Sequence, residues 1–199
     1  YKTGTVCGNM VGDRIRFILK KENLTIKYLA DWSRVARSSL HRFLDAEEPD
    51  IPKAETLDKI IKTGDTVLDM GCGSGILAIS SLLLGAKTAF GVDIDPLAVK
   101  TAVENGKMNG LGEPQLQFVC GDLADKVTKK YDVVVANIVA DIIILFSTQV
   151  RAFMKQGAKF VASGIIDSRA DEVVLALQNA GLLVKERIEE NGWVCLVCE

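Results

Sequence analysis

The spacing of hydrophobic and polar residues changes character near residue 62 of the chain. Before that point, apolar residues recur at intervals of three or four, as Val11, Ile15 and Ile18 do. This periodicity predicts short amphipathic helices that pack into a small all-α domain over residues 1–62. A last helix, over residues 53–62, fits either this domain or the one that follows it.

After residue 62, short apolar runs typical of buried strands alternate with helical segments. The alternation predicts βαβ units and an α/β domain with a parallel sheet over residues 63–199. The last two runs are joined by Asn191-Gly192, which predicts an antiparallel hairpin at the sheet edge. The expected strands are residues 66–70, 88–92, 116–120, 132–136, 158–163, 184–190 and 193–198, and the expected helices are residues 75–84, 96–109, 139–154 and 168–180.

The composition is that of a globular protein and argues against several other classes. Of the 199 residues, 48% are hydrophobic and 25% are charged. The apolar runs are far shorter than the ~20 residues of a membrane-spanning helix, so we expect no membrane association. We recognise no secretory signal, and five Cys in an apolar setting are typical of reduced thiols in the cytoplasm. Cys195 and Cys198 are spaced like metal ligands, but no second pair or histidine lies near them in the sequence, so we expect no metal site.

Charge is distributed unevenly between the two predicted domains. Residues 1–62 contain 12 Lys and Arg against 9 Asp and Glu, whereas residues 63–199 contain 12 against 17. A basic segment before an acidic domain suits a module that binds a polyanion and a second domain with another task.

The most informative segment is the run from Asp69 to Gly75, where a predicted buried strand leads into three glycines at alternate positions. Glycine is needed where the backbone turns tightly and approaches a ligand, and the helix that follows favours a negative group at its N-terminus. A nicotinamide or flavin fingerprint would need a further glycine where Ile76 stands. The pattern Asp-x-Gly-x-Gly-x-Gly instead resembles motif one of class I methyltransferases, whose cofactor is S-adenosylmethionine.

Polar residues follow the next three predicted strands. Asp93 stands 22 residues after Gly71, where a carboxylate can hold a ribose diol, Asp122 is placed to accept from an adenine amino group, and Asn137 follows the fourth strand. Because the carboxyl ends of parallel strands form the ligand side of an open α/β sheet, we expect these groups to share one site. Taken singly, Asp93, Asp95 and Asn137 could instead cap helices, and Asp122 could be a turn residue. The predicted cofactor-binding residues are Asp69, Gly71, Gly73, Gly75, Asp93, Ile94, Asp122, Leu123 and Asn137.

A longer series of segments resembles the ribosomal protein L11 methyltransferase family over residues 62–199. The matching segments are residues 64–79, 84–86, 92–96, 137–138, 162–166 and 192–194. The resemblance implies a Rossmann-like class I methyltransferase that modifies protein amino groups, with Gly71, Asp93 and Asn137 contacting the cofactor. We expect Asn137 and the backbone carbonyl of Ile138 to orient the acceptor amine, since an in-line displacement needs mainly an aligned nucleophile. The sequence identifies no general base.

Three features depart from known patterns. The family has a substrate-recognition domain before the catalytic one, and here a different domain stands in its place. Its Gly-Thr-Gly-x-His-x-Thr-Thr type loop, expected near residues 43–51, finds no match there. The run from Asn137 to Ala140 lacks the Pro-Pro-aromatic sequence of DNA base methyltransferases, which argues against a base as acceptor.

Residues 11–62 resemble the Cro/repressor-like (XRE-type) helix-turn-helix family. The resemblance implies a recognition helix over residues 37–44 that presents its polar side chains to the major groove of double-stranded DNA. Arg34 in the turn and Ala36 at the helix N-cap differ from the usual family residues. The predicted DNA-binding residues are Arg37, Ser38, Ser39 and Arg42.

The sequence leaves three hypotheses open. The first is an S-adenosylmethionine-dependent methyltransferase with a protein substrate of the ribosomal-protein class and an appended helix-turn-helix. The second is a DNA-binding transcription regulator that senses S-adenosylmethionine without turnover. The third is that the two domains are joined without a functional relation.

Overall fold

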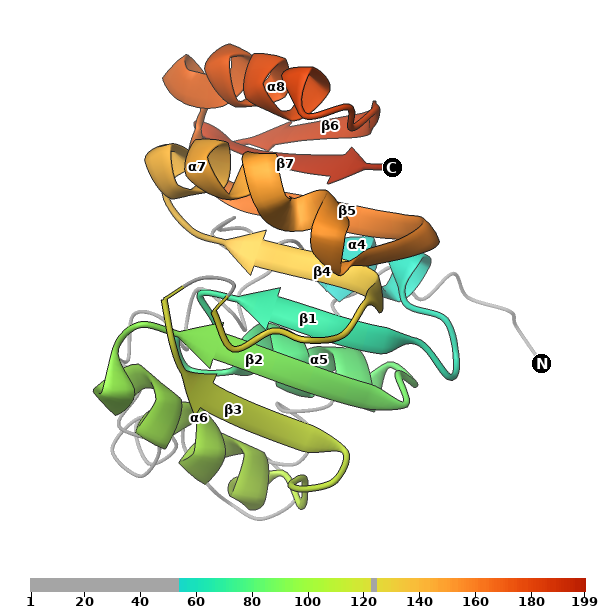
Figure 1. The fold of residues 1–199 in the computed structure, drawn as a ribbon, viewed down its shortest axis with the longest axis vertical. Helices are drawn as coiled ribbons and strands as arrows, with labels where there is room; N and C mark the ends of the chain where they lie inside the picture. The colour runs from blue at the N-terminus through green and yellow to red at the C-terminus, as the bar shows by residue number, and fades with distance from the viewer. Residues whose placement is uncertain (1–53, 123–124) are drawn as a thin grey trace, which may run out of the picture.

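The computed structural model describes residues 54–122 and 125–199, which form a sheet with helices on both faces (Figure 1). Its strands are β1 (Thr66–Met70), β2 (Thr88–Asp93), β3 (Leu116–Cys120), β4 (Tyr131–Asn137), β5 (Met154–Ile166), β6 (Val184–Glu190) and β7 (Trp193–Cys198). Its helices are α4 (Ala54–Ile60), α5 (Ile76–Leu83), α6 (Pro96–Met108), α7 (Ala140–Val150) and α8 (Ala170–Asn179), with short 3-10 turns η1 (Arg151–Phe153) and η2 (Asp167–Arg169).

The strand order in the sheet is β3-β2-β1-β4-β5-β7-β6. Strands β1 to β5 are parallel, whereas β7 pairs antiparallel with β5 and β6 antiparallel with β7. The path through the sheet therefore starts at β1 in its middle, moves outward through β2 and β3, and returns to the other side of β1 with β4. The point between β1 and β4 is where strand order reverses, and ligands of open α/β sheets bind there, outside the carboxyl ends of the strands.

Alternate residues along the central strands enter two hydrophobic cores. Leu68 of β1 packs on one face, with Phe146 of α7 and Leu177 of α8. Val67 packs on the other face, with Leu77 of α5 and residues of α4 and α6. This two-residue alternation is the side-chain period of a strand, and because both faces are covered, both kinds of position are apolar.

Helix α4 belongs to the packing of the sheet. Leu57 is 1% exposed and lies with Ile60 and Ile61 in the same core cluster as Val67 and Leu77. The helix that the sequence left open between two domains therefore covers one face of the α/β domain.

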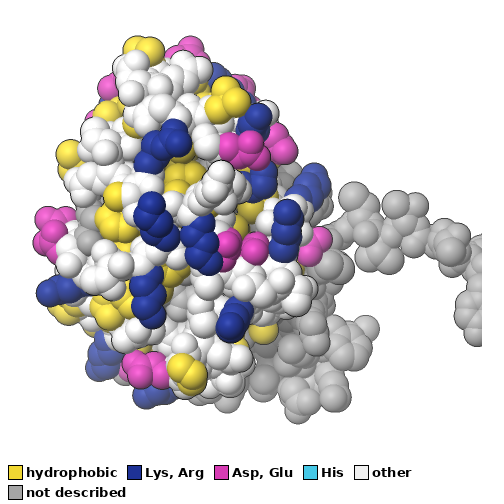
Figure 2. Space-filling model, turned by 45° about the vertical axis from the view of Figure 1, so that its right-hand side comes forward, with side chains coloured by type: hydrophobic (Ala, Val, Ile, Leu, Met, Phe, Trp, Pro, Cys, Tyr) yellow, Lys and Arg dark blue, Asp and Glu magenta, His cyan; other side chains and the backbone are white. Residues whose placement is uncertain are grey.

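The amino-terminal edge of the sheet is held by a small polar network. Oδ2 of Asp132 accepts from the backbone N–H of Thr66 at 2.9 Å, from the Thr66 hydroxyl at 2.7 Å and from Nζ of Lys155 at 2.7 Å. These contacts join β1, β4 and β5 at the edge opposite the carboxyl ends. Figure 2 shows Lys and Arg side chains across the middle of one face, with fewer Asp and Glu side chains among them.

Most predicted elements are confirmed within one or two residues, and the largest difference concerns the segment after α7. The helix predicted over residues 139–154 is wrong in its last turn, because α7 ends at Val150 and β5 already begins at Met154. Phe146, Val150 and Met154 are spaced as on a helix and enter the same core, yet Phe146 and Val150 lie on α7 and Met154 lies on β5. Met154 pairs with Tyr131 of β4, and this long-range pairing decides its conformation.

Two sequence-based predictions fall partly or wholly outside this description. The predicted helix-turn-helix, with Arg37, Ser38, Ser39 and Arg42, lies outside the described residues, and so does Leu123. Within the described ranges, no helix combines the length and the apolar character needed to cross a bilayer.

Candidate functional site

The loop between β1 and α5 carries the three glycines in left-handed conformations. Gly71, Gly73 and Gly75 have φ angles of +69°, +52° and +78°, which side chains disfavour and glycine adopts without cost. The backbone N–H groups of Gly71 and Cys72 donate to the carbonyl oxygen of Val92 at 2.8 and 3.0 Å. The loop is therefore fixed to the carboxyl end of β2.

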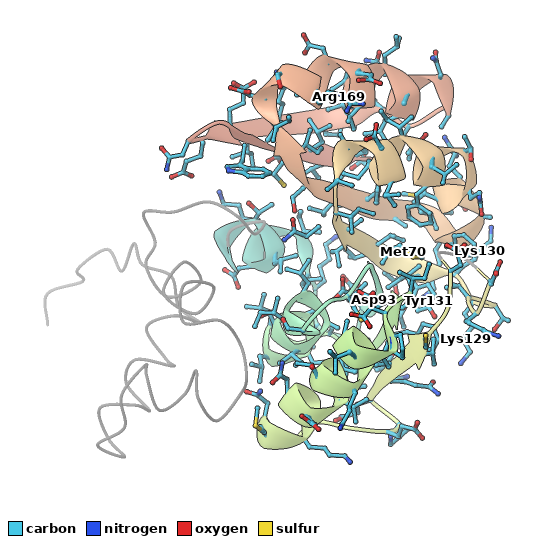
Figure 3. All side chains as sticks on the ribbon, turned by 90° about the vertical axis from the view of Figure 1, so that its left-hand side faces the viewer. Met70, Asp93, Lys129, Lys130, Tyr131 and Arg169 are labelled. Carbon is cyan, nitrogen blue, oxygen red and sulfur yellow. The ribbon has the colours of Figure 1, made fainter. Side chains whose placement is uncertain are left out.

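Asp93 links this loop to the start of α6. Its Oδ2 accepts from the backbone N–H of Gly73 at 2.7 Å, and its Oδ1 accepts from the backbone N–H of Asp95 at 2.9 Å. The helix cap is Asp95, whose Oδ1 accepts from the backbone N–H of Leu97 at 2.8 Å. Figure 3 shows Asp93 close to Met70, near the middle of the sheet. Of the two carboxylates, Asp95 has the capping role and Asp93 has the role of holding the glycine loop.

Asp69 lies beneath the loop and is 1% exposed. Its Oδ2 accepts from the backbone N–H of Ala78 at 3.0 Å, and its Oδ1 has no hydrogen-bond partner within the described part of the chain. Burial raises the pKa of Asp69 to about 7, against the opposing hydrogen bond from Ala78 and with a further rise from the charge of Asp93. Such a perturbed carboxyl below a ligand loop is typical of functional sites.

Residues that the sequence did not single out support the loop from below. The side-chain Nδ2 of Asn105, on α6, donates to the carbonyl oxygen of Ser74 at 2.8 Å and is itself buried. A Cβ on Gly91 would lie 2.4 Å from the ring of Phe118 and 3.0 Å from Cβ of Cys72, so the loop packs closely on β2 and β3. A glycine inside a predicted strand is the one signal that could have indicated this close approach.

The end of β4 meets the glycine loop from the other side of the switch point. Asn137 is the last residue of β4, and the backbone N–H of Ile138 donates to the carbonyl oxygen of Ser163 at 3.2 Å. A Cβ on Gly71 would lie 2.4 Å from Cγ2 of Ile138, so Ile138 packs directly on the loop. The N-cap of α7 is Val139, and Asn137 is therefore not the helix cap.

The third strand completes the same edge. The backbone N–H of Gly121 donates to the carbonyl oxygen of Asp93 at 3.0 Å, which brings the end of β3 beside the end of β2. Asp122 follows Gly121 and is exposed, and Ile94 is exposed as well, with 69% of its surface accessible. All predicted cofactor-binding residues that the structure describes thus lie at the carboxyl edge of β1 to β4; their roles remain predictions.

These groups fit S-adenosylmethionine on features of the chain itself. The Cβ position of Gly73 faces open space, with nothing within 4 Å, so the loop leaves room for a ligand. The Asp69 carboxyl has an unpartnered oxygen, and Asp93 retains lone pairs that can accept from a ribose diol.

Where the chain is described, it contains no cluster of three His, Cys, Asp or Glu side chains that could hold a metal ion. Burial raises the pKa values of Cys195 and Cys198 to about 12.

Sequence comparisons place residues 54–199 in the family model described as ribosomal protein L11 methyltransferase. A protein of that name from Pelotomaculum thermopropionicum is 46% identical over 140 residues, which cover 70% of this chain and 45% of the relative. One from Clostridium botulinum is 42% identical over 145 residues, covering 73% and 46%. The chain thus spans less than half the length of these curated relatives.

Solved structures agree with the fold. A ribosomal protein L11 methylase from Lactobacillus delbrueckii subsp. bulgaricus superposes with a TM-score of 0.69 at 28% identity, covering 72% of this chain and 73% of that one. A TehB-like methyltransferase from Corynebacterium glutamicum, described as SAM-dependent, superposes with a TM-score of 0.62 at 16% identity, covering 84% and 97%, and supports the fold alone. With its glycine loop, its Asp93 contact and its match over residues 54–199, this chain belongs to the ribosomal protein L11 methyltransferase family of S-adenosylmethionine-dependent enzymes.

Proposed function

We propose that this protein transfers methyl groups from S-adenosylmethionine to amino groups of a protein substrate, and that the substrate is a ribosomal protein. The observation that carries the proposal is the hydrogen bond from the Gly73 N–H to Oδ2 of Asp93, which joins the glycine loop and the carboxylate in one site. The names of the relatives supply the substrate class.

The residues divide into a binding part and an orienting part. When bound, S-adenosylmethionine supplies an electrophilic methyl group on a sulfonium. Asp93 would hold the ribose diol, Asp122 the adenine amino group, and the glycine loop the methionine part. Because the pKa of Asp69 is about 7, its carboxyl can ionise near neutral pH, and the ionised form favours a positively charged ligand, since opposite charges attract more strongly where water is excluded.

Asn137 and Ile138 form the orienting part at the end of β4. The side-chain oxygen of Asn137 and the backbone carbonyl of Ile138 would accept N–H hydrogen bonds from the acceptor amine and direct its lone pair. Positioning of this kind contributes strongly to a displacement that needs little covalent help from the protein.

Two measurements on the full chain test the proposal. Calorimetry with S-adenosylmethionine measures cofactor binding, and mass spectrometry of recombinant ribosomal protein L11 after incubation with protein and cofactor measures methyl addition. We expect binding and added methyl mass for the wild type, and no added methyl mass for Asn137→Ala. Absence of binding by the wild type would contradict the whole proposal, and binding without methylation would contradict the substrate class.

The helix-turn-helix and its DNA contacts stay predictions from sequence. If these predictions are right, the protein binds double-stranded DNA in a salt-dependent manner, and the binding weakens when Arg37 and Arg42 are both replaced by Ala. Unchanged DNA affinity in that double variant would remove the hypothesis. The names of the relatives do not favour a cofactor-sensing regulator, so we do not extend that alternative.

A further inference from the structure

The segment at the end of β5 lies directly against the orienting residues of β4. The parallel pairing of these strands ends with Asn137 opposite Ser163, and the backbone N–H of Ile138 donates to the carbonyl oxygen of Ser163 at 3.2 Å. The residue after this last pair is Gly164. Whatever conformation Gly164 adopts therefore limits the space available to Asn137 and Ile138.

A β-bulge fixes the conformation of Gly164. On the other side of β5, Ala162 pairs with Leu196 and Ile165 pairs with Val194, so β5 contains one more residue than β7 between these pairs. Gly164 sits in this bulge with a φ angle of +76°, in the left-handed region. Bulges with a left-handed glycine bend a strand locally and are found beside active sites, where they redirect the chain.

The missing side chain of Gly164 faces the orienting groups. A Cβ at this position would lie 2.6 Å from Oδ1 of Asn137, 3.0 Å from the carbonyl oxygen of Ile138 and 3.2 Å from the backbone nitrogen of Ile138. Real Cβ atoms essentially never approach another heavy atom within 3.0 Å, so the Asn137 side chain would have to move. The two groups with which the proposed mechanism directs the amine are thus the two that a side chain at position 164 would displace.

We propose that Gly164 is a positioning residue for methyl transfer, and that its lack of a side chain sets the orientation of the Asn137 carboxamide and the Ile138 carbonyl. The inference rests on the proposed function, because the proposed function assigns the Asn137 carboxamide and the Ile138 carbonyl to the acceptor amine. Gly164 itself touches neither partner of the reaction in this proposal. Its effect should therefore fall on transfer and leave cofactor binding intact.

The chain offers a closely matched control on the same strand. Gly157 also lies on β5 and also has a φ angle of +76°, but a Cβ there would have nothing within 4 Å. Gly157→Ala and Gly164→Ala hence place alanine at the same φ angle, and only the second introduces contacts with Asn137 and Ile138. A difference between the two variants therefore reports these contacts.

The first measurement does not depend on activity. In ¹⁵N-labelled full-length protein, the side-chain NH₂ signals of Asn137 are assigned by their loss in Asn137→Ala. We expect Gly164→Ala to shift these signals and Gly157→Ala to leave them in place. Unshifted Asn137 signals in folded Gly164→Ala would overturn the proposal, whether or not the wild type methylates ribosomal protein L11.

The second measurement is steady-state methylation of ribosomal protein L11 with calorimetric binding of S-adenosylmethionine alongside. For Gly164→Ala we expect kcat to fall by about tenfold to a hundredfold, because a misplacement of about 1 Å can cost about a hundredfold in rate. The Kd for S-adenosylmethionine should stay within about twofold of the wild type, and Gly157→Ala should keep both values. Equal kcat values for the two glycine variants would count against the proposal, whereas a wild type without transfer contradicts the proposed function and leaves the NMR result to decide on Gly164.

A double variant covers the case in which Gly164→Ala does not fold. Asn137→Ala removes the contact at 2.6 Å and leaves those with the Ile138 backbone at 3.0 and 3.2 Å, so the combination Asn137→Ala with Gly164→Ala should be more soluble than Gly164→Ala alone. Where all variants fold, the loss in Tm caused by Gly164→Ala should be smaller in the Asn137→Ala background than in the wild type. A double variant no more soluble than Gly164→Ala, or an equal loss in both backgrounds, would show that Gly164 does not act through Asn137.

Discussion

The backbone N–H of Gly73 donates to Oδ2 of Asp93 at 2.7 Å, so one carboxylate holds the tip of the glycine loop against the end of β2. The two residues are 20 positions apart in the sequence. Oδ1 of the same carboxylate accepts a hydrogen bond from the backbone N–H of Asp95. Asp93 therefore shapes the site in addition to offering its lone pairs to a ligand.

Replacing Asp93 by Ala should weaken cofactor binding. The substitution removes the acceptor of the Gly73 N–H and the proposed acceptor of the ribose diol, and hydrogen bonds to a charged group are worth about 1.5–3 kcal/mol. We expect the Kd for S-adenosylmethionine, measured by calorimetry, to rise about tenfold to a hundredfold.

Asp95→Ala is the matched control, two residues further along. It removes the N-cap of α6 and should lower the free energy of unfolding by about 1 kcal/mol while leaving the Kd near the wild-type value. Equal Kd values for wild type and Asp93→Ala would show that this carboxylate does not bind the cofactor.

Asp69 should make stability depend on pH. Its pKa is raised by burial from the ordinary value of 3.8 to about 7 in the folded protein. Between about pH 4 and pH 7 the unfolded chain loses this proton while the folded chain keeps it, so the folded state binds more protons. The Asp69 contribution to stability is therefore fully present below about pH 4 and is lost as pH rises to about 7.

Urea titrations of wild type and Asp69→Asn at several pH values measure this contribution. The difference in free energy of unfolding, wild type minus variant, should fall by an amount on the order of 4 kcal/mol across the window and then level off. A difference that is constant with pH would mean that Asp69 titrates normally despite its burial.

Gly91→Ala should destabilise the fold by overpacking. The added methyl group would lie 2.4 Å from the ring of Phe118, whose position is fixed by the core beneath β2 and β3. We expect a loss of about 1–3 kcal/mol in the free energy of unfolding, measured by denaturant titration. Gly112→Ala, at an exposed glycine with open space around its Cβ position, should change it by less than about 0.5 kcal/mol. Similar losses for both variants would contradict close packing at Gly91.

Gly73→Ala should separate cofactor binding from stability. Gly73 and Gly110 both have left-handed φ angles, of +52° and +70°, and neither has an atom within 4 Å of a Cβ position. Each alanine should therefore cost about 1 kcal/mol of stability through backbone strain. Only Gly73→Ala places a methyl group in the space of the proposed ligand, so only this variant should weaken S-adenosylmethionine binding in calorimetry. A normal Kd for Gly73→Ala would place the ligand elsewhere.

Local patterns made much of the fold predictable. The apolar run of residues 66–70 and the Asn191-Gly192 turn are patterns of neighbouring residues, and the strand and the hairpin that they predict are both confirmed. The same holds for the run from Asp69 to Gly75, because the need for glycine arises from the backbone angles at each position. The predicted end of the helix after β4 was wrong, because Met154 keeps helical spacing but pairs with Tyr131, which is 23 residues away in the sequence.

The sequence by itself determined the class of this protein: a parallel α/β sheet with polar groups after consecutive strands, which resembles the ribosomal protein L11 methyltransferase family. Only the tertiary structure decided which atoms meet. It divided the roles of Asp93 and Asp95, buried one oxygen of Asp69 without a partner, and set Gly164 against Asn137. Helical or strand character follows from residues a few positions apart, whereas these contacts depend on the register of neighbouring strands and on a one-residue bulge, which no local pattern specifies.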